Sequence, residues 1–249
     1  MRAPWQPEDL ALVFTTCPRE PAYFPASLAS ALLGDPLAAR LREIVVAVDA
    51  PDLACVAPLT GHARVRWVAR TAEENARVAP FHLHRRACHN YWRALGLAES
   101  GVRGVLACED DVVFRDGWLA MLLESWNEMQ ADGLESFILA AYSAYDHERP
   151  TLGRGRYYSS YPAHEFYGTQ ALVYPHADLT PVREMLWASG VLNPEAPYDL
   201  LVGRVAVARQ HLYATRSALA QHVGRQSSGL GDGCNRSPTF TRLWPDAAR

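Results

Sequence analysis

Short apolar runs recur along the first three-quarters of the chain and alternate with stretches in which apolar residues have helical spacing. The runs predict strands over Leu10–Thr15, Ile44–Val48, Val65–Val68, Val105–Ala107, Phe137–Ala141 and Ala171–Tyr174. The helical spacing covers Pro25–Leu33, Phe81–Leu97 and Trp118–Met129. Short buried strands followed by helices predict an α/β fold with a mostly parallel central sheet flanked by helices. Ligands of such sheets bind beyond the carboxyl ends of the strands.

The 249 residues contain no internal repeat and no linker-like tract, which indicates one domain over residues 1–249. The helix expected at Trp118–Met129 has Trp118, Met121, Leu122, Trp126 and Met129 on its inward side. No apolar stretch is long enough to span a membrane, and the five cysteines contain no CxxC pair. We therefore expect a cytoplasmic protein in a reducing compartment.

Charge narrows the range of functions. The formal net charge is -3, so nucleic acid is not an expected partner. All 24 basic residues are arginine, which excludes lysine nucleophiles and a phosphate-loop lysine. An anionic ligand must then be held by arginine, by backbone N–H groups or by a metal. GxSxG, HExxH, P-loop and GxGxxG motifs are also absent from the sequence.

The most informative segment is the acidic triplet Glu109-Asp110-Asp111, which follows the apolar run Val105–Ala107 and precedes Val112–Phe114. Three adjacent carboxylates repel one another, and their burial is costly unless a cation or hydrogen-bond donors compensate them. Oxygen ligands suit Mg²⁺ or Mn²⁺. The alternative is a solvated acidic turn, which the apolar flanks disfavour.

Cationic residues accompany this triplet. On the helix expected at Phe81–Leu97, four side chains share one face by their spacing, namely His82, Arg86, His89 and Arg93. That face either lines a phosphate or nucleotide pocket or is simply solvated. Its place directly before the acidic strand favours the pocket.

Other candidates lie at expected strand ends or helix starts. The first strand ends at Thr15 and leads to Arg19, and the second strand is followed by Asp49. Asp199 comes at the start of an expected helix, where it is either an N-cap or a catalytic carboxylate. His222 is either a metal ligand or a structural residue.

Taken together, these motifs resemble those of GT-A-fold (Rossmann-like) glycosyltransferases. The triplet matches the EDD variant of the family's DxD motif. The segments His89–Leu95 and Val105–Val112 are similar to the donor-site helix and metal strand of N-acetylglucosaminyltransferase I. Acceptor-side segments of N-acetylglucosaminyltransferase IV-like enzymes and of lipopolysaccharide or collagen galactosyltransferase-like enzymes resemble Tyr167–Pro175, Pro197–Leu201 and Gln221–Ser228.

The resemblance implies a division of the domain into a nucleotide-sugar-binding half, 1–115, and an acceptor half with a C-terminal lid, 116–249. It implies Mn²⁺ or Mg²⁺ as cofactor, with Asp111 and His222 as metal ligands, and Asp199 as the catalytic base. Glu165 is an alternative base. The lid would contain Ser227–Gly233. The nucleotide-sugar ligands implied are Thr15, Arg19, Asp49, His89, Arg93, Glu109, Asp110 and Arg225.

The implied activity is a metal-dependent, inverting transfer of a sugar from a nucleotide-sugar donor, expected to be a UDP-sugar, to a hydroxyl acceptor. A bacterial type of enzyme is expected, and retaining chemistry stays open. Two other functions fit the same residues: a nucleotide-sugar-binding protein without turnover, and a metal-dependent phosphoester hydrolase. The acceptor class is open, because the tyrosines that would stack against it can equally pack the core: Tyr142, Tyr145, Tyr157, Tyr158, Tyr161 and Tyr167.

Overall fold

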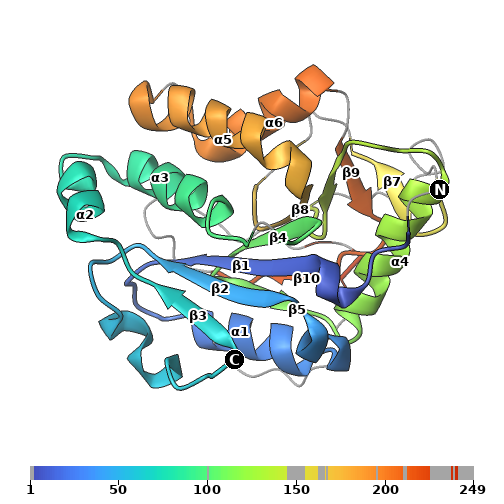
Figure 1. Cartoon of the computed structure of the whole chain (residues 1–249), viewed down its shortest axis with the longest axis horizontal. Helices are drawn as coiled ribbons and strands as arrows, with labels where there is room; N and C mark the ends of the chain where they lie inside the picture. The colour runs from blue at the N-terminus through green and yellow to red at the C-terminus, as the bar shows by residue number, and fades with distance from the viewer. Residues whose placement is uncertain are drawn as a thin grey trace.

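A computed structural model places eight strands in one central sheet with helices on both faces (Figure 1). It describes residues 3–99, 101–144, 155–161, 166, 168–194, 196–209, 212–224, 237, 239 and 240. The strand order is β3-β2-β1-β4-β8-β6-β9-β7. The predicted mixed α/β class with a flanked central sheet is confirmed.

One side of the sheet is parallel throughout. It consists of β3 (Val65–Val68), β2 (Glu43–Val48), β1 (Leu10–Thr16) and β4 (Gly104–Glu109). The other side is mixed: β8 (Ala171–Pro175) runs antiparallel to β4 and to β6 (Ile138–Ala140). Next come β9 (Leu212–Thr215), which is parallel to β6, and β7 (Tyr158–Ser160), which is antiparallel to β9. All six predicted strands are present, and β7 and β9 lie outside those predictions.

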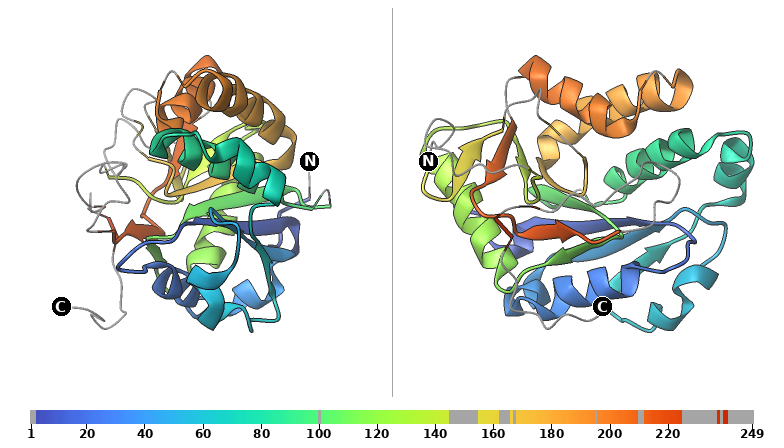
Figure 2. Two further views of the ribbon diagram at one scale, coloured as in Figure 1. Left: turned by 90° about the vertical axis from the view of Figure 1, so that its left-hand side faces the viewer. Right: turned by 180° about the vertical axis from the view of Figure 1, so that it is seen from behind.

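Helices close both faces of the sheet, as the two views of Figure 2 show. One face is covered by α1 (Phe24–Leu33) and α4 (Trp118–Ala131). The other is covered by α3 (Leu83–Leu95), α5 (Leu179–Leu186) and α6 (Tyr198–Arg209). The remaining helical segments are α2 (Ala72–Val78), η1 (Pro7–Asp9), η2 (Pro36–Arg40), η3 (Ala54–Leu59), η5 (His176–Asp178) and the π-helical η6 (Trp187–Leu192).

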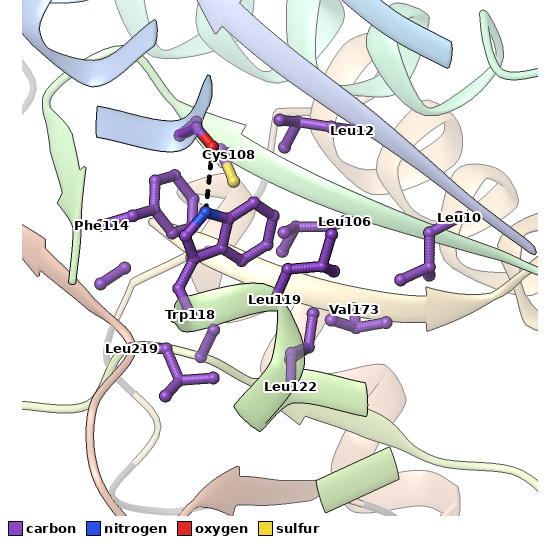
Figure 3. Close-up of a cluster of buried hydrophobic side chains, with 14 of the residues drawn as sticks. Leu10, Leu12, Leu106, Cys108, Phe114, Trp118, Leu119, Leu122, Val173 and Leu219 are labelled. Carbon is purple, nitrogen blue, oxygen red and sulfur yellow. Dashed lines mark hydrogen bonds between the residues drawn. The ribbon is translucent and has the colours of Figure 1, made fainter. Parts of the chain in front are cut away.

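The core forms because successive residues of each strand point to opposite faces. Leu12 and Phe14 of β1 pack on the α1 and α4 side, whereas Ala11 and Val13 pack on the α3 side. At the start of α4, Trp118 is fully buried among Leu106, Phe114 and Leu119 (Figure 3). Its indole Nε1 donates to the carbonyl of Ala31 over 3.0 Å, which ties α4 to α1.

The predicted inward face of α4 is largely confirmed. Trp118, Leu122, Trp126 and Met129 are at most 2% exposed, and Met121 is partly buried. No helix in the described ranges has both the length and the apolar character needed to cross a bilayer.

A two-stranded antiparallel ribbon lies beside the main sheet. It pairs β5 (Val112–Phe114) with β10 (Ala220–His222), and His222 lies opposite Val112. Because β5 begins directly after the acidic triplet, this pairing brings β10 back to the carboxyl end of β4. Segments more than 100 residues apart in the sequence therefore meet at one edge of the sheet.

Candidate active site

The acidic triplet closes β4 and turns the chain into β5. Glu109 is the last residue of β4, and Asp110 and Asp111 form the turn. Both aspartates are 7% exposed. Both aspartates are therefore enclosed, whereas Glu109 is half-buried. This rules out a solvated acidic turn and means that the buried negative charge must be compensated.

Arg19 supplies positive charge to both aspartates. Its Nη2 lies 2.6 Å from Asp110 Oδ1 and 3.0 Å from Asp111 Oδ2. The Thr16 hydroxyl donates to Asp110 Oδ2 over 2.8 Å. Burial nevertheless raises the pKa of Asp110 to about 6, because it outweighs the stabilising charge of Arg19.

His222 approaches Asp111 from β10. Its Nε2 lies 3.1 Å from Asp111 Oδ2, and the Val223 N–H donates to the Asp111 carbonyl over 2.8 Å. Burial disfavours charge on both side chains. Their mutual contact outweighs it, so the pKa of Asp111 is lowered and that of His222 is raised. A Cβ at Gly224 would collide with the Asp111 carboxylate, so a larger residue there would displace that carboxylate.

Glu109 makes a different set of contacts. Its Oε1 accepts hydrogen bonds from the Thr169 hydroxyl over 2.7 Å and from the Tyr198 hydroxyl over 2.8 Å. Burial, with the nearby charge of Asp111, raises the pKa of Glu109 to about 7. Sequence reasoning gave no role to Thr169 or Tyr198. The only available signal was the adjacency of Tyr198 to Asp199.

Asp199 lies in the first turn of α6 and is half-buried. Its Oδ1 accepts the N–H of Leu200 over 2.8 Å. Because the helix begins at Tyr198, Asp199 is inside it and is not its N-cap. The Tyr198–Glu109 hydrogen bond brings this end of α6 to the acidic turn.

A second polar cluster lies at the ends of β2 and β3. The Asp49 carboxylate is 2.6 Å from Arg70 Nη1 and 3.4 Å from Arg86 Nη2, and Asp49 is 6% exposed. Burial raises the pKa of Asp49, against the opposing effect of the arginines. The Asp49 N–H donates to the Thr16 carbonyl over 2.8 Å, so this arginine cluster adjoins the end of β1 and the acidic turn.

Two further residues of the predicted α3 stripe, His89 and Arg93, are enclosed rather than solvated. Arg93 Nη2 donates to the carbonyls of Val68 and Ala69 over 2.8 and 2.5 Å, at the end of β3. His89 is fully buried between the rings of Phe81 and Trp92, and burial lowers its pKa to about 4. The solvated-face alternative is thus wrong for both residues, whereas His82 is exposed at the N-cap of α3.

The predicted nucleotide-sugar ligands form two groups: those that lie at the acidic turn or beside it, and those that are occupied elsewhere. The structure brings Arg19, Glu109 and Asp110 together and sets Asp49 beside them. Arg93 is occupied by strand carbonyls, His89 packs within the core, and the Thr15 hydroxyl donates to the Cys108 carbonyl over 3.4 Å. Nothing in these contacts tests nucleotide binding, so all these roles stay predictions.

Several predicted features lie outside the described residues: Arg225, Glu165, the lid segment Ser227–Gly233, Tyr145 and Tyr167. Of the other tyrosines, Tyr142, Tyr158 and Tyr161 are at most 3% exposed and pack in the core, whereas Tyr157 is half-buried. The described residues hold no group of three His, Cys, Asp or Glu side chains arranged to bind a metal. Asp111 and His222 therefore form a pair of candidate ligands.

No protein-family model and no curated protein sequence matches the chain. Among solved structures, residues 1–349 of S. aureus TarS, a GT-A-like glycosyltransferase, are similar, with a TM-score of 0.58 and 16% identity. The match covers 87% of this chain and 60% of that one, so this chain spans less than two thirds of its neighbour. The narrower likeness to N-acetylglucosaminyltransferases and galactosyltransferases stays a prediction. At this identity the similarity shows the fold alone, a mixed α/β domain with a large central sheet that resembles a glycosyltransferase domain.

Proposed function

We propose that this protein is a metal-dependent, inverting glycosyltransferase that moves a sugar from a UDP-sugar to a hydroxyl acceptor. One observation carries the proposal: on a sheet whose fold resembles that of a glycosyltransferase domain, the buried Asp111 and the half-buried His222 lie 3.1 Å apart at the carboxyl end of β4. This is the edge at which open α/β sheets bind their ligands.

The residues present fit a divalent cation. Asp111 Oδ1 is buried and has no hydrogen-bond partner among the described residues, so it has an unused lone pair at the site. A carboxylate oxygen with an imidazole nitrogen is a donor set that suits Mn²⁺. Mg²⁺ is the alternative, since it prefers oxygen ligands. When bound, such an ion would stabilise negative charge on the departing diphosphate.

Side chains around the turn have the chemistry to hold the donor. We assign phosphate contact to Arg19, because its guanidinium lies at the acidic turn, within 3.0 Å of both aspartates, and arginine binds phosphate oxygens well. Hydroxyl groups of the ribose or sugar can donate to the carboxylates of Glu109 and Asp110. The arginine cluster around Asp49 extends the site along the sheet edge, toward the nucleoside end of the donor.

Asp199 is the proposed base. In an inverting displacement the acceptor hydroxyl attacks the anomeric carbon, the bond to the diphosphate breaks, and the hydroxyl proton passes to a carboxylate on the attacking side. Asp199 is half-buried on α6, and its neighbour Tyr198 anchors that helix to Glu109. The helix start is thereby held at a fixed position relative to the acidic turn.

The test is release of UDP from UDP-glucose, UDP-galactose and UDP-N-acetylglucosamine with Mn²⁺, first with water as acceptor. We expect slow release from one donor, its loss in EDTA, and a decrease of about 100-fold in Asp199→Asn. The exposed Asp116→Asn is the matched control and should keep wild-type release.

Two outcomes would contradict the proposal. Binding of a nucleotide sugar with no release under any condition would indicate a binding protein without turnover. Cleavage of simple phosphodiesters at a higher rate than any UDP-sugar would indicate a phosphoester hydrolase instead.

A further inference from the structure

Arg19 contacts both aspartates of the acidic turn through a single nitrogen. Its Nη2 donates a hydrogen bond to Asp110 Oδ1 over 2.6 Å and forms an ion pair with Asp111 Oδ2 over 3.0 Å. The Arg19 side chain is 11% exposed, so salt and water screen these contacts much less than they screen a surface pair. A second positive charge on Asp111 would therefore interact strongly with this guanidinium.

The two aspartates depend on Arg19 in different ways. Asp110 has two further donors, the Thr16 hydroxyl at 2.8 Å and the Cys17 N–H at 3.4 Å. At Asp111, Arg19 shares Oδ2 with His222, whose Nε2 lies 3.1 Å from that oxygen. Arg19 is thus an arginine on the same carboxylate to which the proposed function assigns the metal.

Arg19 and a divalent cation on Asp111 would be like charges on one carboxylate. Their repulsion is larger in a partly buried site than in water, because the effective dielectric constant is lower there. The Arg19–Asp111 contact must then weaken binding of the cation, and the cation must weaken that contact to the same extent. This reciprocity holds for any two groups that change each other's binding.

A bound diphosphate would offer Arg19 another partner. Residue 19 lies between β1 and α1, outside both elements, and its guanidinium carbon lies 4.8 Å from the centre of the Tyr23 ring. One nitrogen makes both carboxylate contacts, so Arg19 lacks the two-nitrogen fork that forms the strongest carboxylate pairs. Since guanidinium groups bind phosphate oxygens as well as carboxylates, a diphosphate at the turn can take Arg19 from Asp111.

We propose that Arg19 is an internal counter-cation that competes with the divalent metal for Asp111 until the diphosphate of the donor binds its guanidinium. The inference rests on the proposed function and adds to it a coupling between two ligands. Arg19 weakens binding of the metal alone, and the nucleotide removes this effect. Metal and nucleotide therefore strengthen each other's binding through Arg19.

Two simpler roles of Arg19 predict different results. If Arg19 only stabilised the buried negative charge of the turn, its loss would disturb the site and lower the affinity for metal. If its charge acted only through space, its loss would raise the affinity for metal by the same factor with and without nucleotide. Competition alone predicts a gain that nucleotide abolishes.

Electron paramagnetic resonance of free Mn²⁺ measures the affinity of the full chain for this metal, with and without saturating UDP. Arg19→Met should tighten binding of Mn²⁺ alone about tenfold and should not tighten it when UDP is bound. The ratio of the two Kd values should therefore fall about tenfold. Arg19→Gln, which keeps an N–H₂ donor for Asp110, should give the same signs, and Arg19→Lys, which keeps the charge, should stay close to wild type. Arg40→Met, which breaks an exposed pair with Glu8, is the control and should bind Mn²⁺ like wild type.

Three results would overturn this inference. Equal or weaker binding of Mn²⁺ alone by both uncharged variants, each shown to be folded by circular dichroism, would mean that Arg19 does not compete, and the proposed metal site would stand. Tighter binding by the same factor with and without UDP would reduce Arg19 to a through-space charge, and that site would again stand. No binding of Mn²⁺ by wild type or any variant, even with UDP, would contradict both the inference and the proposed metal site.

Discussion

At the scale of single residues, the carboxyl groups of the acidic turn differ in the positive charges and hydrogen-bond donors that offset the cost of their burial. Arg19 and Thr16 hold Asp110, and His222 with Arg19 holds Asp111. Glu109 accepts hydrogen bonds from two neutral hydroxyl groups. That difference explains why burial dominates at Glu109 and raises its pKa to about 7, whereas the pKa of Asp111 is lowered.

The raised pKa of Glu109 predicts a pH dependence of stability. Between its ordinary value of 4.5 and about 7 the folded protein binds a proton that the unfolded chain has lost, so the unfolding free energy falls as pH rises. Glu109→Gln removes the titrating group and therefore this decrease of the unfolding free energy with pH. The amide oxygen of the glutamine can still accept hydrogen bonds from the hydroxyl groups of Tyr198 and Thr169. The measurement is urea unfolding in EDTA at a series of pH values. We expect the unfolding free energy of Glu109→Gln minus that of wild type to increase by about 2 kcal/mol between about pH 5.5 and about pH 8.5.

Glu99→Gln, at an exposed site, is the control for this measurement, and its difference from wild type should not change with pH. A difference between Glu109→Gln and wild type that is independent of pH would show that Glu109 titrates normally in the folded protein.

Sequence reasoning identified the acidic triplet because three carboxylates between apolar runs are unusual. It proposed Asp111 and His222 as a pair only through the family resemblance, since 111 positions separate them. Thr169 escaped prediction for a physical reason. Its contact with Glu109 depends on the antiparallel register of β8 against β4, in which the Glu109 N–H donates to the Gln170 carbonyl, and no local pattern encodes that register.

At the scale of elements, α6 is the part whose position matters most for the proposed chemistry. Its first residue, Tyr198, stacks on Tyr91 of α3 at 5.1 Å and donates to Glu109. We regard Tyr198 as a positioning residue that fixes the helix start carrying Asp199.

Tyr198→Phe should keep the ring packing and lose the hydrogen bond. We expect kcat to fall about tenfold with KM nearly unchanged, because Asp199 is held less firmly. The pH profile of kcat should also move to higher pH. The Tyr198 hydroxyl lowers the pKa of Glu109, so its loss leaves that pKa higher. Kinetics over a pH series measure both effects.

Tyr91→Phe is the matched control. It loses a buried hydroxyl that lies 2.8 Å from the Tyr174 hydroxyl, so we expect a similar loss of stability, about 1 kcal/mol, with normal kinetics. Equal kinetic defects in the two variants would mean that Tyr198 acts only through stability.

Arg93 fastens α3 to the sheet. It is 5% exposed, donates to the carbonyls of Val68 and Ala69, and lies 3.4 Å from Glu74. Arg93→Met should lower the unfolding free energy by about 3 kcal/mol, because it leaves buried acceptors unpaired. Denaturant unfolding measures this.

Arg77→Met, which breaks only the exposed pair with Glu73, should change stability by less than about 0.5 kcal/mol. Similar losses in both variants would contradict a structural role specific to Arg93.

Apolar runs predicted six strands, among them the three-residue β6, but not the two strands that pair beside the acidic turn. The strands β5 and β10 have three residues each, too few to show a periodicity. Yet their pairing brings His222 to Asp111, so the part of the site least visible in the sequence depends on the shortest strands.

At the scale of the whole molecule, the parallel strands β3, β2, β1 and β4 (Figure 1) bring four of the predicted nucleotide ligands, Arg19, Asp49, Glu109 and Asp110, to one edge of the sheet. Alternation of strands and helices in the sequence is enough to predict such a sheet, because parallel strands need crossover helices on its faces. The antiparallel insertion of β8 between β4 and β6 was not predictable, since it depends on long-range pairing. The division at residue 115 stays a prediction.

The most direct test of the account is calorimetric titration of UDP, GDP and CDP into the protein with Mn²⁺ and with EDTA, repeated on Asp111→Asn and on the exposed control Asp116→Asn. We predict that UDP binds with Mn²⁺ only, that Asp111→Asn lowers the affinity at least about 100-fold, and that Asp116→Asn binds like wild type. A folded protein that binds none of the three nucleotides, or that binds UDP equally well in EDTA and after Asp111→Asn, would contradict the proposed donor site.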